Sequence, residues 1–581
     1  MVYNNHIRFE RRQKLQNREY TKLNENEIKE TYEIAWNLIN KWRGSQLENQ
    51  FDIIFIFSRA LIDNPSEYEL LQIDKSIRIL FERIDSKYKD YILEAKENLN
   101  KDQLEYIVLK FDISDFMPNF GGISIEKEFI NLVYKLLKIK TGDKTLELFP
   151  NYGDFLIDYI MNFPKSEITT ISLMTNNVMV LKIRASLLYK VGSKINVIQE
   201  NYLNCDLSNY KFNKVFAIPP FGVKHHSFEG HLEDEKLYKL YEDNDFKVYD
   251  DWIYVLKLIA SEDFEKALFI VPSRLLFSQR NINIKKYLLK EGYIEAIIAL
   301  PEKIFKETSV STNAILISKN NKNIKMIDAG NLYVKDRFIN RIDDENTVKI
   351  LNAYCEESDI SRNVSYDDIE ENDFNLLPRR YTTDAYNIEN YYYLEDIAEI
   401  KRGYANLKKT DLDDRVTNEE TSRKMLTAGD ISDEFSVEEL TNLKNIKEKE
   451  EIYCIENEDI VIVRAGNYKS MIIRDVGSKS IITNGTIYTI RSNKEKINPY
   501  YLQMYLSSDH CQRQIEALTG GTVISFIGIR ELRQLKIPKI SKELENNLSE
   551  KYKAILDKKE IIKIQKRILD EEIDNLVSEV V

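Results

Sequence analysis

The stretch KFNKVFAIPPFGVK, residues 211–224, places a short apolar run directly before two prolines and a phenylalanine. The apolar run indicates a buried strand, and the prolines make a rigid, extended exit from it. The phenylalanine after them offers a flat face for stacking. On spacing alone, Pro-Pro-Phe after a strand is more typical of a stiff loop than of a binding site, so its meaning depends on the surrounding sequence.

Similar apolar runs lie on both sides of this stretch, and segments of helix length separate them. The runs cover residues 145–148, 215–217, 267–271, 296–300 and 314–318. Strands that alternate with helices predict a parallel, doubly wound sheet. Ligands bind such sheets beyond the carboxyl ends of the strands, so we expect any chemistry in the loops after Leu148 and Ala217.

The flanking regions follow other patterns. Residues 1–104 repeat apolar positions at intervals of three and four, which predicts a helical domain. Residues 391–540 hold short strand-like runs separated by turn residues. Residues 541–581 predict a long helix with an apolar stripe that packs on another helix, on a second subunit or on its own domain. The stripe repeats every seven residues at Leu548, Ile555, Ile562, Leu569 and Leu576.

Composition sets limits on the class of protein. The 581 residues are 43% hydrophobic and carry a net charge of −12, which suits several soluble domains and argues mildly against indiscriminate nucleic-acid binding. The four cysteines form no CxxC pair and the histidines are dispersed, so we expect no metal site and a reducing, cytoplasmic setting. No run of about 18 apolar residues occurs, so we expect no membrane segment.

Three further stretches give the Pro-Pro-Phe motif its context. KTGDKTLELFPNYGDFLIDYI (140–160) is a strand, a Gly-containing turn and a helix, an arrangement typical of sites for nucleotide-like cofactors. ALPEKIFKETSVSTNAILISKN (299–320) and IEENDFNLLPRRY (369–381) follow it. Taken in order, these stretches resemble the N6-adenine DNA methylases that serve as modification subunits of type I restriction systems. The resemblance covers 105–385 well and 1–104 more loosely.

This resemblance implies a multidomain α/β protein with four parts. The parts are a helical N-terminal domain (1–104), a Rossmann-like class I methyltransferase domain (105–390), an α+β target-recognition domain (391–540) and a C-terminal helix (541–581). It also implies S-adenosylmethionine as the cofactor and DNA adenine as the substrate.

A second resemblance concerns the C-terminal region. YLEDIAEIKRGY (393–404), IENEDIVIVRAGN (455–467) and TGGTVISFIGIRELRQLKIPKIS (519–541) are similar to a target-recognition unit of a type I specificity subunit. Such a unit reads part of a double-stranded DNA site and ends in a helical spacer. We therefore expect phosphate or base contacts from basic residues in the loops of this region. The candidates are Arg402, Lys424, Arg464, Lys469 and Arg530.

The cofactor turn departs from the family pattern D-P-A-C-G-S-G-G-F-L, which aligns with residues 147–156. The resemblance assigns cofactor contacts to Glu147, Asn151, Gly153 and Asp154. Asn151 and Asp154 replace glycines that would let the backbone approach S-adenosylmethionine, and we expect Tyr152 and Asp154 to crowd the turn. The acidic residue that would bind the ribose hydroxyls is replaced by the uncharged Met174.

The target-base motif departs as well. Its first residue in the family is Asn or Asp, whose oxygen accepts a hydrogen bond from the adenine amino group. Here the motif reads Ile218, Pro219, Pro220 and Phe221, and Ile218 can accept nothing. Loss of this bond in the transition state is a chemical defect. Our hypothesis is a DNA-binding protein of this family whose methyl transfer is impaired or lost.

Two alternatives remain from the sequence. The chain is an active, site-specific adenine-N6 methyltransferase that binds S-adenosylmethionine in an unusual way, or it is a protein–protein scaffold subunit of a defence complex. In the scaffold alternative the helix at 541–581 pairs with a second copy or with restriction or defence subunits. The sequence contains no phosphate-binding G-x-x-x-x-G-K-[ST] loop and no nuclease signature, so cleavage would need a partner.

Overall fold

The computed structural model describes most of the chain. The described residues are 23–43, 47, 49–63, 75–110, 122–163, 165–188, 194–223, 234–247, 250–261, 263–336, 339–382, 388–404, 414–432, 435–466, 468–519 and 527–578. The chain divides into two compact units, Met1–Pro378 and Arg379–Val581, and each is described by itself. The finer division into four parts stays a prediction.

The described residues of the first unit start with helices, as the apolar spacing predicts. Their inward faces carry large apolar side chains such as Trp42, Phe55 and Ile84, all fully buried in one core. Helices α3 and α5 pack against α11 of the following sheet domain. The helices of this part are α2 (Glu25–Arg43), α3 (Asp52–Leu61), α5 (Lys75–Lys87), α6 (Lys89–Asn98) and α7 (Lys101–Lys110).

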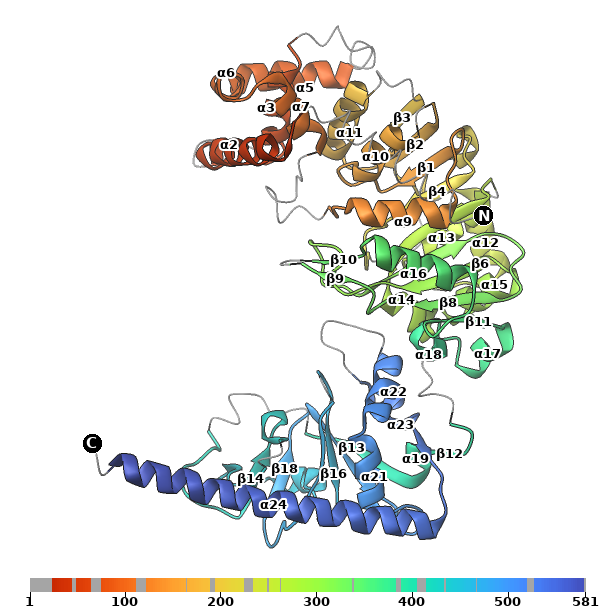
Figure 1. The fold of residues 1–581 in the computed structure, drawn as a ribbon. Helices are drawn as coiled ribbons and strands as arrows, with labels where there is room; N and C mark the ends of the chain where they lie inside the picture. The colour runs from red at the N-terminus through yellow and green to blue at the C-terminus, as the bar shows by residue number, and fades with distance from the viewer. Residues whose placement is uncertain are drawn as a thin grey trace. The chain divides into compact units, whose positions relative to one another are not determined.

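A nine-stranded sheet forms the centre of the first unit among the described residues (Figure 1). Its order is β11-β8-β6-β7-β5-β4-β1-β2-β3. The strands are β1 (Lys144–Leu148), β2 (Glu167–Ser172), β3 (Lys194–Gln199), β4 (Lys214–Ala217), β5 (Lys266–Pro272), β6 (Ile294–Ala299), β7 (Thr312–Ile317), β8 (Ile324–Asp328) and β11 (Ser361–Val364). A separate two-stranded pair consists of β9 (Val334–Lys335) and β10 (Asn340–Arg341). The five apolar runs are confirmed as strands.

The predicted parallel, doubly wound sheet is confirmed in the main, and two of its strands run antiparallel to their neighbours. Strand β7 runs antiparallel to both β5 and β6, and β11 runs antiparallel to β8. Strands β1, β2, β3, β4 and β5 are parallel neighbours. A strand buried on both faces has the same apolar pattern in either direction, so the sequence pattern does not report the reversal.

The helices that connect successive strands pack against the sheet. Phe216, Leu268 and Leu316 pack into one core together with residues of α9 (Lys127–Leu137), α10 (Asp154–Asn162) and α11 (Thr175–Leu188). Their neighbours Val215 and Ala267, which point to the other face, are fully buried as well. The remaining helices are α12 (Glu235–Asp243), α13 (Trp252–Ser261), α14 (Ser273–Phe277), α15 (Ile282–Lys290), α16 (Asp344–Cys355) and α17 (Tyr366–Glu371).

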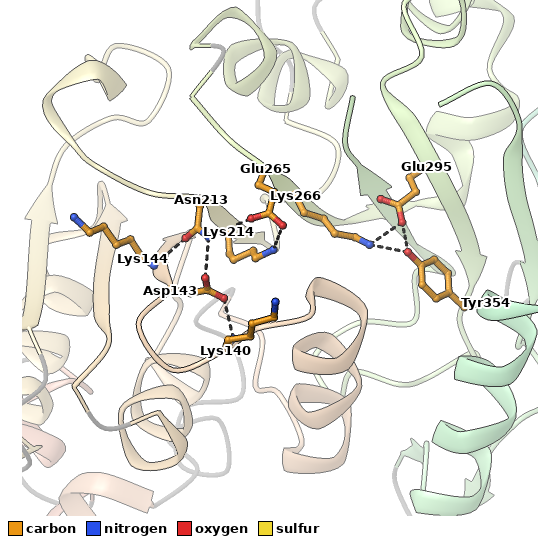
Figure 2. Close-up of polar contacts among 9 residues, drawn as sticks. All are labelled: Lys140, Asp143, Lys144, Asn213, Lys214, Glu265, Lys266, Glu295 and Tyr354. Atoms are coloured by element: carbon orange, nitrogen blue, oxygen red, sulfur yellow. Dashed lines mark hydrogen bonds and ion pairs between the residues drawn. The ribbon is translucent and has the colours of Figure 1, made fainter. Parts of the chain in front are cut away.

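A polar network fixes the amino ends of the strands, at the edge opposite the predicted ligand crevice (Figure 2). Asn213, just before β4, donates to Asp143 at 2.8 Å and accepts from the Lys144 amide at 2.9 Å. Lys266 Nζ, at the start of β5, donates to Glu295 Oε1 at 2.7 Å and to the Tyr354 hydroxyl at 2.6 Å. Because Tyr354 lies on α16, this contact joins α16 to β5 and β6.

The second unit combines small sheets with helices, which is the predicted α+β class. One sheet has the order β13-β19-β16-β17 and another β15-β14-β18, while β12 pairs with β20. The strands are β12 (Tyr391–Tyr393), β13 (Ala398–Arg402), β14 (Arg423–Leu426), β15 (Thr441–Asn442), β16 (Ile460–Val463), β17 (Ser470–Ile472), β18 (Ser480–Thr483), β19 (Ile487–Ser492) and β20 (Lys536–Pro538). The helices are α18 (Arg379–Thr382), α19 (Leu394–Ile397), α21 (Pro499–Leu506), α22 (Asp509–Thr519), α23 (Ile529–Arg533) and α24 (Lys542–Ser578).

The long C-terminal helix α24 is confirmed. Its apolar contacts with the core of its own unit lie in its first part, and further along Lys563 Nζ donates to the Phe435 carbonyl at 2.6 Å. Leu548, Tyr552 and Leu556 contact the core of the second unit, and α24 lies along α21. Further along the predicted stripe, Ile555, Ile562 and Leu569 are 51%, 63% and 58% exposed. No helix in the described part of the chain has the length and apolarity needed to cross a membrane.

Candidate cofactor and base site

The turn between β1 and α10 bends sharply at the carboxyl edge of the sheet. Phe149, Asn151 and Gly153 have φ of 58°, 47° and 89°, all in the left-handed region. Glycine adopts this region without strain and asparagine tolerates it, but a phenylalanine there costs energy. The turn closes with a hydrogen bond of 2.7 Å from the Gly153 amide to the Pro150 carbonyl.

The side chain of Asn151 binds backbone on both sides of the turn. Its Oδ1 accepts from the Ile123 amide at 3.2 Å, and its Nδ2 donates to the Phe149 carbonyl at 3.0 Å. Ile123 belongs to the segment that leads into α9. The side-chain amide group of Asn151 therefore links that segment to the turn after β1.

Asp154, the first residue of α10, attaches the same segment a second time. Its Oδ2 accepts from the Ile125 amide at 3.0 Å and from the Ser124 hydroxyl at 3.3 Å. The Ser124 amide donates to Glu307 Oε2 at 3.2 Å, and Glu307 comes from the loop between β6 and β7. Three consecutive amides, at 123, 124 and 125, are thus bound by side chains rather than left available to a ligand.

Tyr152 fills the remaining space on this side of the turn. It is 3% exposed, and a side-chain carbon at Gly122 would lie 2.6 Å from its Cζ atom. Its carbonyl accepts a hydrogen bond from Arg184 of α11, which also donates from Nε to the Val108 carbonyl at 2.8 Å. Arg184 is 1% exposed, so a buried guanidinium links the turn to the N-terminal helices.

Glu147 lies in β1 just before the turn and is 1% exposed. Burial and the negative charge of Asp154 raise its pKa well above the ordinary value. Its Oε2 atom is buried and has no hydrogen-bond partner among the described residues. A buried acceptor without a donor costs free energy, so a donor-bearing ligand would satisfy this carboxyl.

Met174 lies after the carboxyl end of β2, where the resemblance implies a contact with the cofactor ribose. Its side chain is 64% exposed, and the adjacent Leu173 is 61% exposed. Ser172, Leu173 and Met174 supply no carboxylate between β2 and α11. Nothing at this position can pair with two hydroxyl groups in the way that an acidic side chain does.

The Pro-Pro-Phe motif leaves the sheet at the carboxyl end of β4. Ile218 is 3% exposed and packs in the main core, and Phe221 is half-buried against the same core. Pro219 is buried and Pro220 is exposed. Position 218 is therefore an apolar packing position in this chain.

The residue after the motif is held by a carboxylate that the sequence did not single out. The Gly222 amide, at a φ of 70°, donates to Asp251 Oδ2 at 3.0 Å. Asp251 directly precedes α13 and is 4% exposed. Burial raises its pKa, and the neighbouring Asp250 adds to the rise. Ser124, Arg184 and Glu307 were missed in the same way, because their partners are distant in sequence.

The basic residues expected to contact DNA differ widely in their surroundings. Arg402 is exposed and donates from Nε to the Gly485 carbonyl at 3.1 Å. Arg464 is 6% exposed, donates to the same carbonyl, and lies 4.9 Å from the centre of the Tyr488 ring. These two guanidinium groups converge on the turn between β18 and β19.

The surroundings of the other three candidates differ from those of that pair. Lys424 is fully buried, and its Nζ donates to Glu420 Oε1 at 2.7 Å and to the Glu438 carbonyl at 3.1 Å. Lys469 and Arg530 are exposed. A lysine that is buried and bound in this way has no surface to offer a phosphate.

Two family models match parts of the chain. The strand order around β1 and β4, with the turn after β1, is that of a class I methyltransferase fold. Residues 165–390 match the family model of the N-6 DNA methylases, and residues 389–575 match that of the type I restriction modification DNA specificity domain. Residues 165–390 therefore form an N-6 DNA methylase domain, and residues 389–575 behind it form a type I restriction modification DNA specificity domain.

Named relatives agree with this assignment. The chain is 27% identical over 199 residues to the type I restriction enzyme MpnII methylase subunit of Mycoplasma pneumoniae, a match that covers 32% of this chain and 35% of that protein. It is 25% identical over 308 residues to the MjaVII methylase subunit of Methanocaldococcus jannaschii, covering 48% of this chain and 52% of the relative. The chain thus spans between a third and about half of the length of these two relatives.

A solved structure with a similar arrangement is the type I restriction-modification methyltransferase subunit of Streptococcus thermophilus. It is 21% identical, with a TM-score of 0.46, and the match covers 56% of this chain and 79% of that one.

Proposed function

We propose that this chain is a sequence-specific DNA-binding protein of the N-6 DNA methylase family whose methyl-transfer site is closed. The observation that carries the proposal is the attachment of residues 123–125 to Asn151 and Asp154. Both side chains stand where the family has glycine, and both form hydrogen bonds within the chain. We infer that S-adenosylmethionine does not fit a turn whose side chains and facing amides are already bound to one another.

Two more features support the proposal. The exposed Met174 supplies no carboxylate for ribose hydroxyls, and leaving such hydroxyls unpaired costs about 1–3 kcal/mol each. The buried Ile218 supplies no acceptor for an adenine amino group. The substituted positions form their own packing and hydrogen bonds, which is expected of a fold retained without its original chemistry.

The active-enzyme alternative keeps one observation in its favour. Glu147 Oε2 is buried without a partner, and the ammonium group of an amino acid is a natural donor to such a carboxylate. The methionyl part of S-adenosylmethionine carries an ammonium group of this kind. Activity would require the turn after β1 to open so that Glu147 faces the ammonium group of S-adenosylmethionine.

Transfer of tritium from labelled S-adenosylmethionine to unmethylated genomic DNA separates the two functions. We expect no transfer above background for the wild-type chain, and no heat of binding when S-adenosylmethionine is titrated into it. The variant Ile218→Asn restores only the base acceptor, so it should also be inactive. Clear turnover by either protein contradicts a closed cofactor site.

We further propose that double-stranded DNA is bound through the specificity domain, and that α24 is the assembly surface. Arg402, Lys469 and Arg530 are the exposed basic residues among those predicted. The apolar side chains of Ile555, Ile562 and Leu569 favour a second helix as the partner of α24, in another copy of this chain or in a restriction subunit. A cytoplasmic setting remains part of the proposal.

A further inference from the structure

A groove of about 1030 Å³ lies in the second unit between strand β17 and helix α24. Four consecutive residues, 469–472, line it along β17. Successive side chains of a strand point to opposite faces, so a hollow that touches four in a row follows the edge of the strand. Strand β17 is the last of the four strands in its sheet, so this edge carries no further described strand.

The pairing of β17 with β16 fixes which main-chain groups face the groove. The Val463 amide donates to the Lys469 carbonyl at 2.9 Å, and the Ile473 amide donates to the Asp459 carbonyl at 2.8 Å. Antiparallel partners alternate between bonded and non-bonded pairs, so every second residue of β17 directs its amide and carbonyl away from β16. Ile472 is one of these residues, and both of its main-chain groups lack a hydrogen-bond partner among the described residues.

Gln503 of α21 occupies one end of this edge. Its Nε2 donates to the Ser470 carbonyl at 3.1 Å, as the amide of a neighbouring strand would. The side chain lines the groove and is 3% exposed, and its Oε1 is buried without a hydrogen-bond partner among the described residues. Native proteins pair nearly all such atoms, so an acceptor left open beside an open strand edge indicates a ligand that supplies an amide donor.

The rest of the lining is apolar or balanced in charge. Val437 is buried and Met471 and Leu556 are half-buried, and all three line the groove. The lining includes three basic and four acidic residues, and two of them, Arg474 and Asp557, pair with each other at 2.6 Å. Nucleic-acid backbones require a concentration of positive charge, which this groove lacks. The lining therefore favours an uncharged occupant with apolar side chains.

We propose that β17 binds an extended, uncharged peptide segment of a partner protein as an added strand. One peptide residue exchanges both main-chain bonds with Ile472, and a neighbouring peptide amide donates to Gln503 Oε1. Alternate peptide side chains pack on Met471 and Leu556. Main-chain bonds to an open edge, with pockets for every second side chain, are a general mode of peptide recognition. The site is independent of the cofactor turn and of DNA binding.

Hydrogen exchange resolved to single amides tests the proposal on the full chain. The probe is a pool of capped hexapeptides with Val, Leu or Phe at alternate positions and Ser between them. Binding should slow exchange of the Ile472 amide by about tenfold or more, because that amide gains an acceptor. The Met471 amide is the internal control, since it faces β16 and should not change. If no member of the pool slows exchange at Ile472, the proposal is wrong.

Matched N-methylated peptides test the strand geometry without altering the protein. In an added strand, alternate amides face β17 and the others face away. Methylation of one set should therefore abolish protection of Ile472, and methylation of the other set should leave it unchanged. Equal effects of the two sets would exclude strand addition.

A variant of the chain tests the contribution of Gln503. Gln503→Met removes the open acceptor and should weaken peptide binding by about threefold to tenfold, the value of one hydrogen bond. Asn546→Met, at an exposed position of α24 outside the groove, should keep wild-type affinity. Unchanged affinity in a folded Gln503→Met chain would remove Gln503 from the site. If that variant does not fold, the N-methylated peptides still decide the proposal.

Two further measurements test other occupants. Exchange at Ile472 in the chain alone should be fast at every protein concentration, and slowing at high concentration would assign the edge to a second copy instead. The double variant Ile562→Lys, Leu569→Lys alters exposed positions of α24 that do not line the groove, so it should bind the peptide as the wild-type chain does. Loss of binding in this variant would place the peptide on α24 and overturn the proposal.

Discussion

Asp154 and Ile125 are joined by a hydrogen bond of 3.0 Å from the Ile125 amide to the Asp154 carboxylate, which fixes the start of α10 to the segment before α9. In the family pattern position 154 is a glycine and cannot make this bond. Under the proposed function, the aspartate both replaces a glycine of the cofactor turn and adds a contact that stabilises the closed turn.

The first prediction concerns this contact. The double variant Asn151→Gly, Asp154→Gly removes three side-chain bonds to residues 123–125, so the free energy of unfolding should fall by about 2–4 kcal/mol. Glycine at position 151 removes the strain of a left-handed φ, and this gain offsets a small part of the lost stability. Urea unfolding measures the change, and calorimetry with S-adenosylmethionine should detect binding that the wild-type chain lacks.

Asp154→Asn is the control for this prediction. It keeps an acceptor oxygen and removes the charge, so most of the stability should remain. Wild-type stability in the double-glycine variant would mean that these bonds do not hold the segment.

A second prediction concerns the turn at Asp373 and Phe374, close to the end of the first unit. Lys285 of α15 is fully buried, and its Nζ donates to the carbonyls of Leu276 at 3.1 Å and Phe374 at 2.6 Å. Asp373 and Phe374 are both left-handed, with φ of 55° and 54°, so this tight turn needs an external support.

Lys285→Met leaves both carbonyls without this donor and should lower the free energy of unfolding by about 2–4 kcal/mol. Hydrogen exchange at residues 373–377 should accelerate as well. Lys290→Met, an exposed change at the end of the same helix, should leave both measurements unchanged. Slow exchange at 373–377 in Lys285→Met would show that the turn supports itself.

The third prediction uses the network at the amino edge of the sheet (Figure 2). Burial acts to raise the pKa of Glu295, but hydrogen bonds from Lys266 and Tyr354 outweigh it, so the net pKa lies below the ordinary value. A carboxyl whose pKa is lowered by folding contributes stability above its unfolded pKa of about 4.3, and loses it as the pH falls through the folded value.

Glu295→Gln should therefore destabilise the chain most near pH 7, and the difference from wild type should shrink below about pH 4. Urea unfolding across this range measures it. The exposed Glu291→Gln is the matched control. A difference that stays constant with pH would show that the charge of Glu295 plays no part.

The fourth prediction concerns α24. Ile562 and Leu569 are 63% and 58% exposed. The double variant Ile562→Lys, Leu569→Lys should prevent two copies of α24 from pairing, because it places charge in their apolar interface. Sedimentation equilibrium should then give the mass of a single chain, whereas the wild-type chain and the exposed polar variant Glu560→Lys should give that of two. Equal masses for all three proteins would exclude pairing of two copies through α24.

Much of the fold was predictable because burial leaves a direct record in the sequence. Strands β1, β4 and β5 coincide within a residue or two with their apolar runs. Strand β2, Glu167–Ser172, was not predicted because threonines fill its middle, although they are buried. Strand β3 lies at the sheet edge and is largely not buried, so its pattern is weak.

The site was predictable only in part. The departures at Asn151 and Asp154 are visible in the sequence, but their bonding partners are not, because Ile123 and Ile125 contribute only backbone amides. Asp251 gave no signal because it lies in a short charged stretch that resembles an exposed loop. An acidic pair directly before an apolar helix, in the segment between the strand-exit motif and the next strand, is the pattern that would have pointed to it.

The last prediction separates two lysines that the sequence could not distinguish. Lys469 is exposed beside β17, whereas Lys424 is buried and bound by Glu420 and the Glu438 carbonyl. If the specificity domain binds DNA through exposed cations, Lys469→Ala should weaken duplex binding by about threefold to tenfold at low salt and reduce the salt slope by about one. Lys424→Ala should instead cost about 1–3 kcal/mol of stability, because it leaves a carbonyl without its donor, while the folded protein keeps wild-type affinity. Fluorescence anisotropy at several salt concentrations, paired with urea unfolding, measures both effects. A loss of affinity in Lys424→Ala without a loss of stability would place this lysine at the DNA surface and reverse the assignment.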